Sequence, residues 1–402
     1  MSRPTRVFFD GPLISFAEGF ARELIEQGYR PHAATYQLRL IAHLSRWLAA
    51  RHLEAGDLSP VVLNKFLAAR RASGYTLWLS PQALMPFLAH LRNSGWVLAK
   101  PAAERSATEE LLASYHTYLL GARGLAESSA AEYVHLVRPF VATRVVVGEL
   151  DWSGLMPADL TKFVRSDCRR RSIASAKLLV SAVRSLLVYL HVEGLIRRPL
   201  AASVPSAAGS KLAGLPRGLT AHEVEGLLVA CNQRTPAGRR DFAILKLLVR
   251  LGLRAGEVRR VGLDDVDWRA GELIVRGKGN RIDRLPLPPD VGRAIATYLQ
   301  HGRPSTAAGR TIFVRIRAPH RTLTGPAITH VVRAAASRAG LARVTPHCLR
   351  HTVATQMIRS GVPLRDIGQV LRHRRLITTA IYAKLDREGL RDVARLWPAG
   401  AA

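Results

Sequence analysis

Six side chains in the C-terminal half of the chain could together carry out chemistry on a phosphate group. They are two arginines, a lysine, two histidines and a tyrosine: Arg254, Lys278, His347, Arg350, His373 and Tyr382. Arginine binds phosphate through a planar fork that stays charged, histidine transfers protons near neutral pH, and a tyrosine hydroxyl can act as a nucleophile. Each residue alone is ordinary, so the prediction depends on their order and local contexts.

Arg254 is expected at a turn between two helices. The apolar stretch 241–252 predicts a helix, and a second helix is predicted to open at Ala255. A turn between them would present the guanidinium to solvent. Glu257 follows three residues later, so its carboxylate can reach back and orient Arg254. An isolated arginine at a helix start is more often a solvated surface group.

Lys278 is expected at the tip of a β-hairpin. Residues 272–276 and 281–287 read as strands around the sequence Gly-Lys-Gly-Asn. The two glycines allow a tight turn, which could bring the lysine close to a phosphate. The motif by itself favours a solvated turn lysine, and it lacks the pattern of a nucleotide-binding glycine loop.

His347 and Arg350 are expected on one face of a helix. They are three residues apart, Thr345 can cap the helix and Pro346 can begin it. His351 is interpreted as a packing residue or a supporting hydrogen-bond partner.

Two further members of the set lie close to the C-terminus. His373 ends a helix predicted over residues 363–371, and Tyr382 follows nine residues later. A histidine at a helix end is also explained by helix capping alone.

The order Arg, Lys, His-x-x-Arg, His, Tyr resembles the tyrosine recombinase (phage integrase) family, which includes the Xer recombinases. The resemblance covers roughly residues 219–397, and all six positions match. It implies that Arg254 and Arg350 clamp the phosphate, with Glu257 orienting Arg254. It further implies that Lys278 protonates the leaving 5′ oxygen, that His347 and His373 assist, and that Tyr382 is the nucleophile.

The reaction implied by this resemblance is DNA strand transesterification through a 3′-phosphotyrosine, with no metal, ATP or other cofactor. By the same resemblance, four protomers would act on two sites of double-stranded DNA, and related recombinases of the same mobile element are possible partners. One alternative is a type IB topoisomerase, which rejoins the same strand. Another is a sequence-specific DNA-binding protein that does not cut. The doubled helical front end argues against the first, and the complete set of six against the second.

Charge supports a nucleic-acid partner. The 402 residues include 59 Lys+Arg and 30 Asp+Glu, a net charge of +29, which attracts polyanions. An arginine-rich proteome would explain the same excess. Three widely spaced cysteines, Cys168, Cys231 and Cys348, indicate buried free thiols and no zinc site. Without a signal peptide or a stretch of membrane-spanning length, the expected location is cytoplasmic, with no membrane contact.

We expect a mainly α fold: helical N-terminal domains, then a mixed, mostly α catalytic domain with a small antiparallel β-sheet, the tyrosine recombinase fold. The predicted boundaries are 1–100 for an additional helical domain, 107–200 for a helical core-binding domain, 201–218 for a linker and 219–402 for the catalytic domain.

The first two of these domains are interpreted as copies of one four-helix unit. Tyr36 aligns with Tyr133 and Phe66 with Phe163 at an offset of 97, and Gly95 aligns with Gly194 at an offset of 99. Shared apolar spacing between unrelated bundles is the other explanation.

Overall fold

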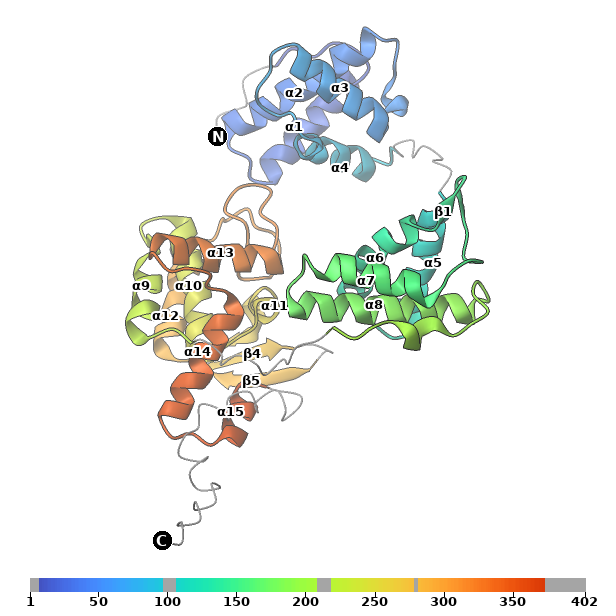
Figure 1. Cartoon of the computed structure of the whole chain (residues 1–402). Helices are drawn as coiled ribbons and strands as arrows, with labels where there is room; N and C mark the ends of the chain where they lie inside the picture. The colour runs from blue at the N-terminus through green and yellow to red at the C-terminus, as the bar shows by residue number, and fades with distance from the viewer. Residues whose placement is uncertain (1–6, 97–105, 208–217, 278–280, 373–402) are drawn as a thin grey trace. The chain divides into compact units, whose positions relative to one another are not determined.

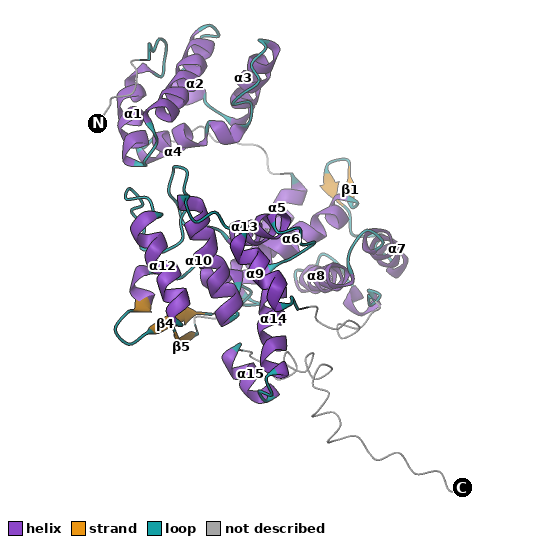
Figure 2. Ribbon diagram, turned by 90° about the vertical axis from the view of Figure 1, so that its left-hand side faces the viewer, coloured by secondary structure: helices purple, strands orange, loops and turns teal. Residues whose placement is uncertain are grey.

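The computed structural model describes residues 7–96, 106–207, 218–277 and 281–372, and it is predominantly helical (Figure 1). Short strands interrupt the helices at only a few places along these ranges (Figure 2). The mostly helical expectation is therefore confirmed. The chain divides into two compact units, one of residues 100–214 and one of residues 1–99 with 215–402. Lys278, His373 and Tyr382 lie outside the described residues, as does the tail over 384–402.

Residues 7–96 form a bundle of four α-helices with short 3-10 turns. The α-helices are α1 (Ala17–Glu26), α2 (Pro31–Ala49), α3 (Pro60–Ala72) and α4 (Met85–Asn93), and the turns are η1 (Ile14–Phe16), η2 (Ala55–Asp57) and η3 (Pro81–Ala83). Their apolar faces bury Phe20, Phe66 and Phe87 in one core. This range contains no strand, as the absence of alternating apolar residues predicted.

Residues 106–207 form a second helical body with its own core. Its elements are α5 (Ala107–Gly121), α6 (Glu127–Ala142), the hairpin β1 (Val145–Val146) and β2 (Glu149–Leu150), α7 (Pro157–Cys168), α8 (Ile173–Val192) and η4 (Leu200–Ser203). Leu200 and Val204 are buried in this core, and Arg184 donates a hydrogen bond to the carbonyl of Val204 over 2.7 Å. The packed structure therefore extends into the range expected to be linker.

The landmarks of the proposed duplication occupy matching places in the two bundles. Tyr36 and Tyr133 lie in the second helix of each, and Phe66 and Phe163 in the third. Gly95 and Gly194 each lie two residues after the end of the last helix, both with positive φ, +79° and +71°. The second bundle differs by its β1–β2 hairpin and by a much longer last helix. The duplication stays a prediction.

Helix α8 corrects the expectation that no stretch of the chain approaches the length of a membrane span. It has 20 residues and a mean hydropathy of 1.6, enough to cross a membrane by length and composition. Leu179, Val183 and Leu186 on this helix are nevertheless fully buried in the bundle core. A long apolar helix at the centre of a folded domain has the same composition as a membrane span.

The range 218–372 contains a helical body and a small sheet. The helices are α9 (Ala221–Val229), α10 (Pro236–Leu251), α11 (Ala255–Val258), α12 (Pro289–His301), α13 (Gly325–Arg338), α14 (Pro346–Arg359) and α15 (Leu364–Val370), with the 3-10 turn η5 (Leu263–Asp265). The strands are β3 (Val266–Asp267), β4 (Glu272–Arg276) and β5 (Ile282–Pro286). They form one antiparallel sheet in the order β3-β4-β5, as expected.

Local sequence signals explain where these elements begin. Thr220 and Glu223 form a reciprocal capping box at the start of α9. In β4, alternate residues Leu273 and Val275 are buried against the helices. The resulting core surrounds α10, which packs against α12 and α14.

All three cysteines lie in described parts of the chain, and none forms a disulfide. Only Cys231 is fully buried; Cys168 and Cys348 are partly accessible. The expectation of uniformly buried thiols is therefore wrong for two of the three.

Candidate active site

A tight turn between α10 and α11 presents Arg254, as the sequence predicted. Helix α10 ends at Leu251, and Gly252 takes a left-handed conformation with φ of +58°. A Cβ atom at Gly252 would lie 2.8 Å from Cδ2 of Leu371, so both the turn and the approach of the α15 end require glycine. Arg254 then serves as the N-cap of α11, with its side chain 44% exposed.

Glu257 is a buried carboxylate that holds two guanidinium groups. Its Oε1 accepts a hydrogen bond from Nη1 of Arg254 over 2.7 Å, and its Oε2 accepts from the Arg254 backbone N–H over 2.8 Å. Oε2 also accepts from Nη2 of Arg372 over 3.0 Å. Burial alone raises the pKa of Glu257, but these bonds and the positive charges of Arg372 and Arg254 outweigh it and lower that pKa. The carboxylate is therefore ionised and can orient Arg254, as expected.

Helix α14 carries His347 and Arg350 close to this turn. Thr345 caps it by accepting a hydrogen bond from the backbone N–H of Cys348 over 3.2 Å, and Pro346 is its first residue. The predicted helix and its cap are confirmed. Positive charge from both Arg350 and Arg254 acts on the imidazole of His347, which places these three side chains in one electrostatic neighbourhood.

His347 and His351 form a pair of neighbouring rings on α14. Their centroids are 4.2 Å apart at an interplanar angle of 68°. Burial, followed by Arg350 and Arg254, lowers the pKa of His347. Burial, followed by His347 and Arg350, lowers the pKa of His351 to about 4. Both imidazoles are therefore neutral near pH 7, and His347, the more exposed of the two, is available to accept a proton. The contact agrees with a packing role for His351.

Arg350 lies beneath the site rather than on its surface. It is 2% exposed; Nη1 donates to the carbonyl of Gly252 over 2.5 Å, and Nη2 donates to the carbonyl of Leu371. A cation at the C-terminal end of α15 is favourable because the last carbonyls of a helix carry partial negative charge. In this structure Arg350 therefore ties α14 to the α10–α11 turn and to α15. Its phosphate-binding role stays a prediction.

The hairpin expected around Lys278 is present on both sides of the turn. Strands β4 and β5 pair from Glu272 with Pro286 to Arg276 with Ile282, and the N–H of Gly277 donates to the carbonyl of Arg281 over 2.8 Å. Lys278 itself, like His373 and Tyr382, lies outside the described residues. The structure thus brings together Arg254, Glu257, His347 and Arg350, and it does not test the other three.

Sequence reasoning missed Arg372. This residue follows the end of α15 in a left-handed conformation, with φ of +55°. Its side chain is 4% exposed and pairs with Glu257. The only signal in the sequence was a basic residue immediately before His373. Neither the backbone conformation nor the distant partner could be read from that.

The arrangement can bind and polarise an anion. Arg254 is partly exposed, held in place by an ionised carboxylate, and accompanied by a neutral imidazole. A phosphate at this surface would meet a fixed guanidinium for its oxygens and a nearby group able to exchange a proton.

Comparisons with known proteins are consistent with this geometry. Residues 217–388 match the model of the phage integrase family. The chain is 37% identical over its whole length to a Sinorhizobium fredii protein called "Putative integrase/recombinase y4rA", of which it covers 97%. It is 32% identical to the tyrosine recombinase XerD of Mycobacterium tuberculosis, over 70% of this chain and 95% of that protein.

A solved structure shares the fold. It is the XerH site-specific recombinase bound to palindromic difH substrate in a post-cleavage complex. The match has a TM-score of 0.55 and 18% sequence identity, and it covers 83% of this chain and 94% of that one.

Proposed function

This chain belongs to the phage integrase family of tyrosine recombinases, and from that premise we propose that it cleaves and rejoins DNA strands at specific sites through a 3′-phosphotyrosine intermediate. The observation that best supports this is the buried Glu257 carboxylate holding the partly exposed Arg254 beside His347. An ion pair of this kind fixes a cation where a scissile phosphate needs charge neutralisation.

In the proposed reaction, the hydroxyl oxygen of Tyr382 attacks the scissile phosphorus. The bond to the 5′ oxygen breaks, and Lys278 supplies the proton that this oxygen takes up. His347, neutral near pH 7, accepts the proton of the nucleophile. The 5′ hydroxyl of a partner strand then attacks the phosphotyrosine, so that the backbone is resealed and Tyr382 is released.

This scheme needs neither metal nor ATP. The energy of the broken phosphodiester is kept in the phosphotyrosine bond, and arginine side chains stabilise the charge of the transition state. His373 would bond a non-bridging oxygen, and Arg350 would complete the phosphate clamp. For the whole protein, we propose a cytoplasmic location and a tetramer that joins two sites of double-stranded DNA.

The nature of the covalent intermediate can be tested with a suicide duplex, in which a nick beside the scissile phosphate lets the cleaved fragment diffuse away. The candidate sites are inverted repeats in the DNA that flanks the gene. The wild-type protein should form a covalent adduct that survives detergent. Tyr382→Phe should bind the duplex and form no adduct, while Tyr133→Phe, a matched change in the second bundle, should behave like wild type.

Three outcomes would contradict the proposal. An adduct that persists in Tyr382→Phe would assign the nucleophile to another residue. A wild-type protein that binds the site and never forms an adduct would favour a non-cutting DNA-binding protein. With two-site plasmids, relaxation without exchanged products would favour a topoisomerase.

A further inference from the structure

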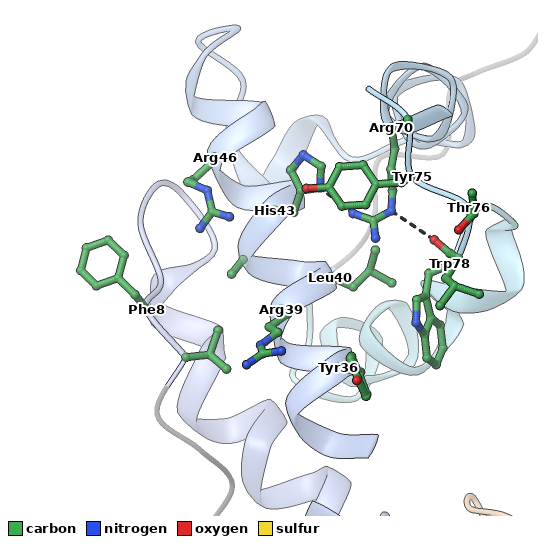
Figure 3. A pocket seen from close by; sticks show the side chains of 14 residues that line it. Phe8, Tyr36, Arg39, Leu40, His43, Arg46, Arg70, Tyr75, Thr76 and Trp78 are labelled. Atoms are coloured by element: carbon green, nitrogen blue, oxygen red, sulfur yellow. Dashed lines mark hydrogen bonds between the residues drawn. The ribbon is translucent and has the colours of Figure 1, made fainter. Parts of the chain in front are cut away.

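The N-terminal bundle contains a surface pocket of about 500 Å³. One face of α2 provides its floor, because Tyr36, Arg39, His43 and Arg46 follow one another at helical spacing. The end of α3 and the loop after it provide the opposite wall (Figure 3). A cavity of this volume is in the range that accommodates a ligand of nucleotide size.

The charge of the pocket is positive. Arg39 and Arg46 are exposed on α2, and Arg70, which is buried, lines the pocket from the end of α3. Nη1 of Arg70 lies 2.6 Å from Nδ1 of His43. Burial, then Arg70 and Arg46, lowers the pKa of His43, as expected where positive charges crowd together. None of the described residues that line the pocket is acidic, so none of them would repel an anion bound at its arginines.

Aromatic rings stand among these cations. Tyr36, Tyr75 and Trp78 are 50%, 47% and 38% exposed. The guanidinium carbon of Arg70 lies 3.9 Å from the centre of the Tyr75 ring, and that of Arg39 lies 5.9 Å from the Tyr36 ring. Phe8, 79% exposed, also lines the pocket. Four exposed rings around one cationic pocket indicate a binding surface.

The backbone of the pocket loop is held in an unusual conformation. Trp78 has φ of +62°, which bulky residues rarely adopt. Arginines fix the loop on both sides of it: Nε of Arg70 donates to the carbonyl of Leu77 over 3.4 Å, and Nη2 of Arg71 donates to the carbonyl of Leu79 over 2.8 Å. The surrounding structure therefore keeps the indole exposed at the pocket mouth, a conformation that costs energy.

We propose that this pocket binds an unpaired nucleotide of a DNA strand, with the phosphate at Arg39 and Arg46 and the base stacked on the exposed aromatic rings. Alternating cations and aromatic faces are the chemistry by which proteins hold single strands without reading sequence. Bases inside a duplex have their faces covered by neighbouring pairs, so they could not use these rings.

The assignment to DNA rests on the proposed function. Strand exchange separates base pairs beside the cut and so produces unpaired nucleotides. Binding at the pocket does not itself need strand cleavage, however. Its test can therefore succeed or fail independently of the covalent chemistry of Tyr382.

The location of binding can be tested by photo-cross-linking with the full-length chain. The probe is a short thymidine oligonucleotide that carries one iododeoxyuridine, which cross-links to stacked aromatic side chains. Peptide mapping should place the adduct on Trp78, Tyr75 or Tyr36, and an excess of duplex of the same sequence should compete poorly. Adducts found only outside residues 7–96, or equal competition by the duplex, would overturn the proposal.

The contribution of the two cations can be measured separately. The double variant Arg39→Ser with Arg46→Ser should lower the slope of log affinity against log salt for the single-stranded oligonucleotide by about 1.4, since each lost phosphate contact removes about 0.7. Trp78→Ala should weaken binding roughly 5- to 150-fold. The matched control is Arg22→Ser with Arg92→Ser, which removes the same charge from exposed positions of the same bundle.

The control distinguishes a specific pocket from the overall positive charge. If both double variants lose affinity and slope equally, the pocket has no special role and the proposal is wrong. The pocket variants should still form the covalent adduct on a suicide duplex whenever the wild type does. If the wild-type protein forms no covalent adduct, the proposed function is refuted, and the cross-linking result is unaffected.

Discussion

Glu257 is the residue on which the described part of the site depends. It is 3% exposed and is the common partner of Arg254 and Arg372. Removing one partner from a buried ion pair leaves the others uncompensated, which costs far more than losing a surface pair. The side chain can therefore be tested through stability as well as through catalysis.

We predict that Glu257→Gln lowers the free energy of unfolding by roughly 3 kcal/mol at pH 7. The pKa of Glu257 is lowered in the folded protein, so its stabilising charge is present above the unfolded pKa, about 4.3, and is lost as the pH falls through the folded value. The difference between variant and wild type in urea unfolding should therefore shrink in acid.

The matched control for this change is Glu272→Gln. Glu272 pairs with Arg284 over 3.2 Å, with both side chains accessible to solvent, and such a surface pair contributes about 1 kcal/mol or less. The prediction is contradicted if Glu257→Gln lowers the free energy of unfolding no more than Glu272→Gln does. It is also contradicted if the effect of Glu257→Gln does not depend on pH. Either result would show that the buried carboxylate does not hold Arg254 and Arg372 in place.

The His347–His351 pair predicts a second pH dependence. Both pKa values are lowered on folding, that of His351 to about 4. Between that value and the unfolded value of about 6.5, the unfolded chain binds more protons, so stability rises with pH. The midpoint of thermal unfolding should increase from pH 4 to pH 6.5, and His351→Gln should flatten this rise. The same change at His330, an exposed histidine on α13, should leave the rise intact.

At the scale of elements, the site depends on how the end of α15 is attached to the α10–α11 turn. Arg350 donates to the carbonyls of Gly252 and Leu371, and Arg372 reaches Glu257. Two arginines thus connect three elements that are far apart in the sequence. His373 is the next residue in the sequence after Arg372, so the described attachment precedes a residue of the proposed chemistry.

This attachment can be tested by comparing Arg372→Ala with Arg372→Gly. Both variants remove the ion pair with Glu257. Arg372→Ala should lower the free energy of unfolding by roughly 3 kcal/mol. In Arg372→Gly the free energy of unfolding should fall by about 1 kcal/mol less than in Arg372→Ala, because glycine adopts the observed φ of +55° without strain. Urea unfolding measures both. Equal losses would mean that the backbone conformation stores no strain, and no loss in either would exclude the attachment.

At the scale of the whole molecule, residues 7–96 and 106–207 each contain one cluster of buried apolar side chains, and residues 218–372 contain a large cluster and a small one between α14 and α15. The candidate site is built on residues 218–372 and the N-terminal pocket on residues 7–96, so different clusters of buried side chains support them. Cleavage chemistry and the additional bundle should therefore be separable.

We predict that deleting residues 1–100 weakens binding to the recombination site and leaves strand cleavage measurable on a suicide duplex. The residues proposed for chemistry all follow residue 250, and the bundle supplies none of them. Binding can be followed by fluorescence anisotropy and cleavage by adduct formation. A truncated protein that is folded by circular dichroism and yet forms no adduct would contradict the prediction.

Much of the fold follows from local sequence signals. The Thr345-Pro346 start of α14 is a predicted helix boundary that the structure confirms. The Thr220–Glu223 box and the left-handed Gly252 are equally local signals at the start of α9 and the end of α10. These signals can be read because a cap or a left-handed turn depends on neighbours within a few residues. The expectation that no stretch reaches membrane length was wrong for α8, whose length and apolar composition are present in the sequence. Its burial in the bundle core is what only the tertiary structure shows.

For the candidate site, the sequence by itself determined which residue types are present, their order, and the short-range pairing of Arg254 with Glu257. Tertiary structure alone decided that Arg350 is buried beneath the turn and that Arg372 shares the Glu257 carboxylate from 115 positions away. It alone gathered α2, α3 and the following loop into a cationic aromatic pocket. The physical reason is that hydrogen bonds within one helical turn are specified by spacing, whereas burial and distant partners depend on how whole helices pack.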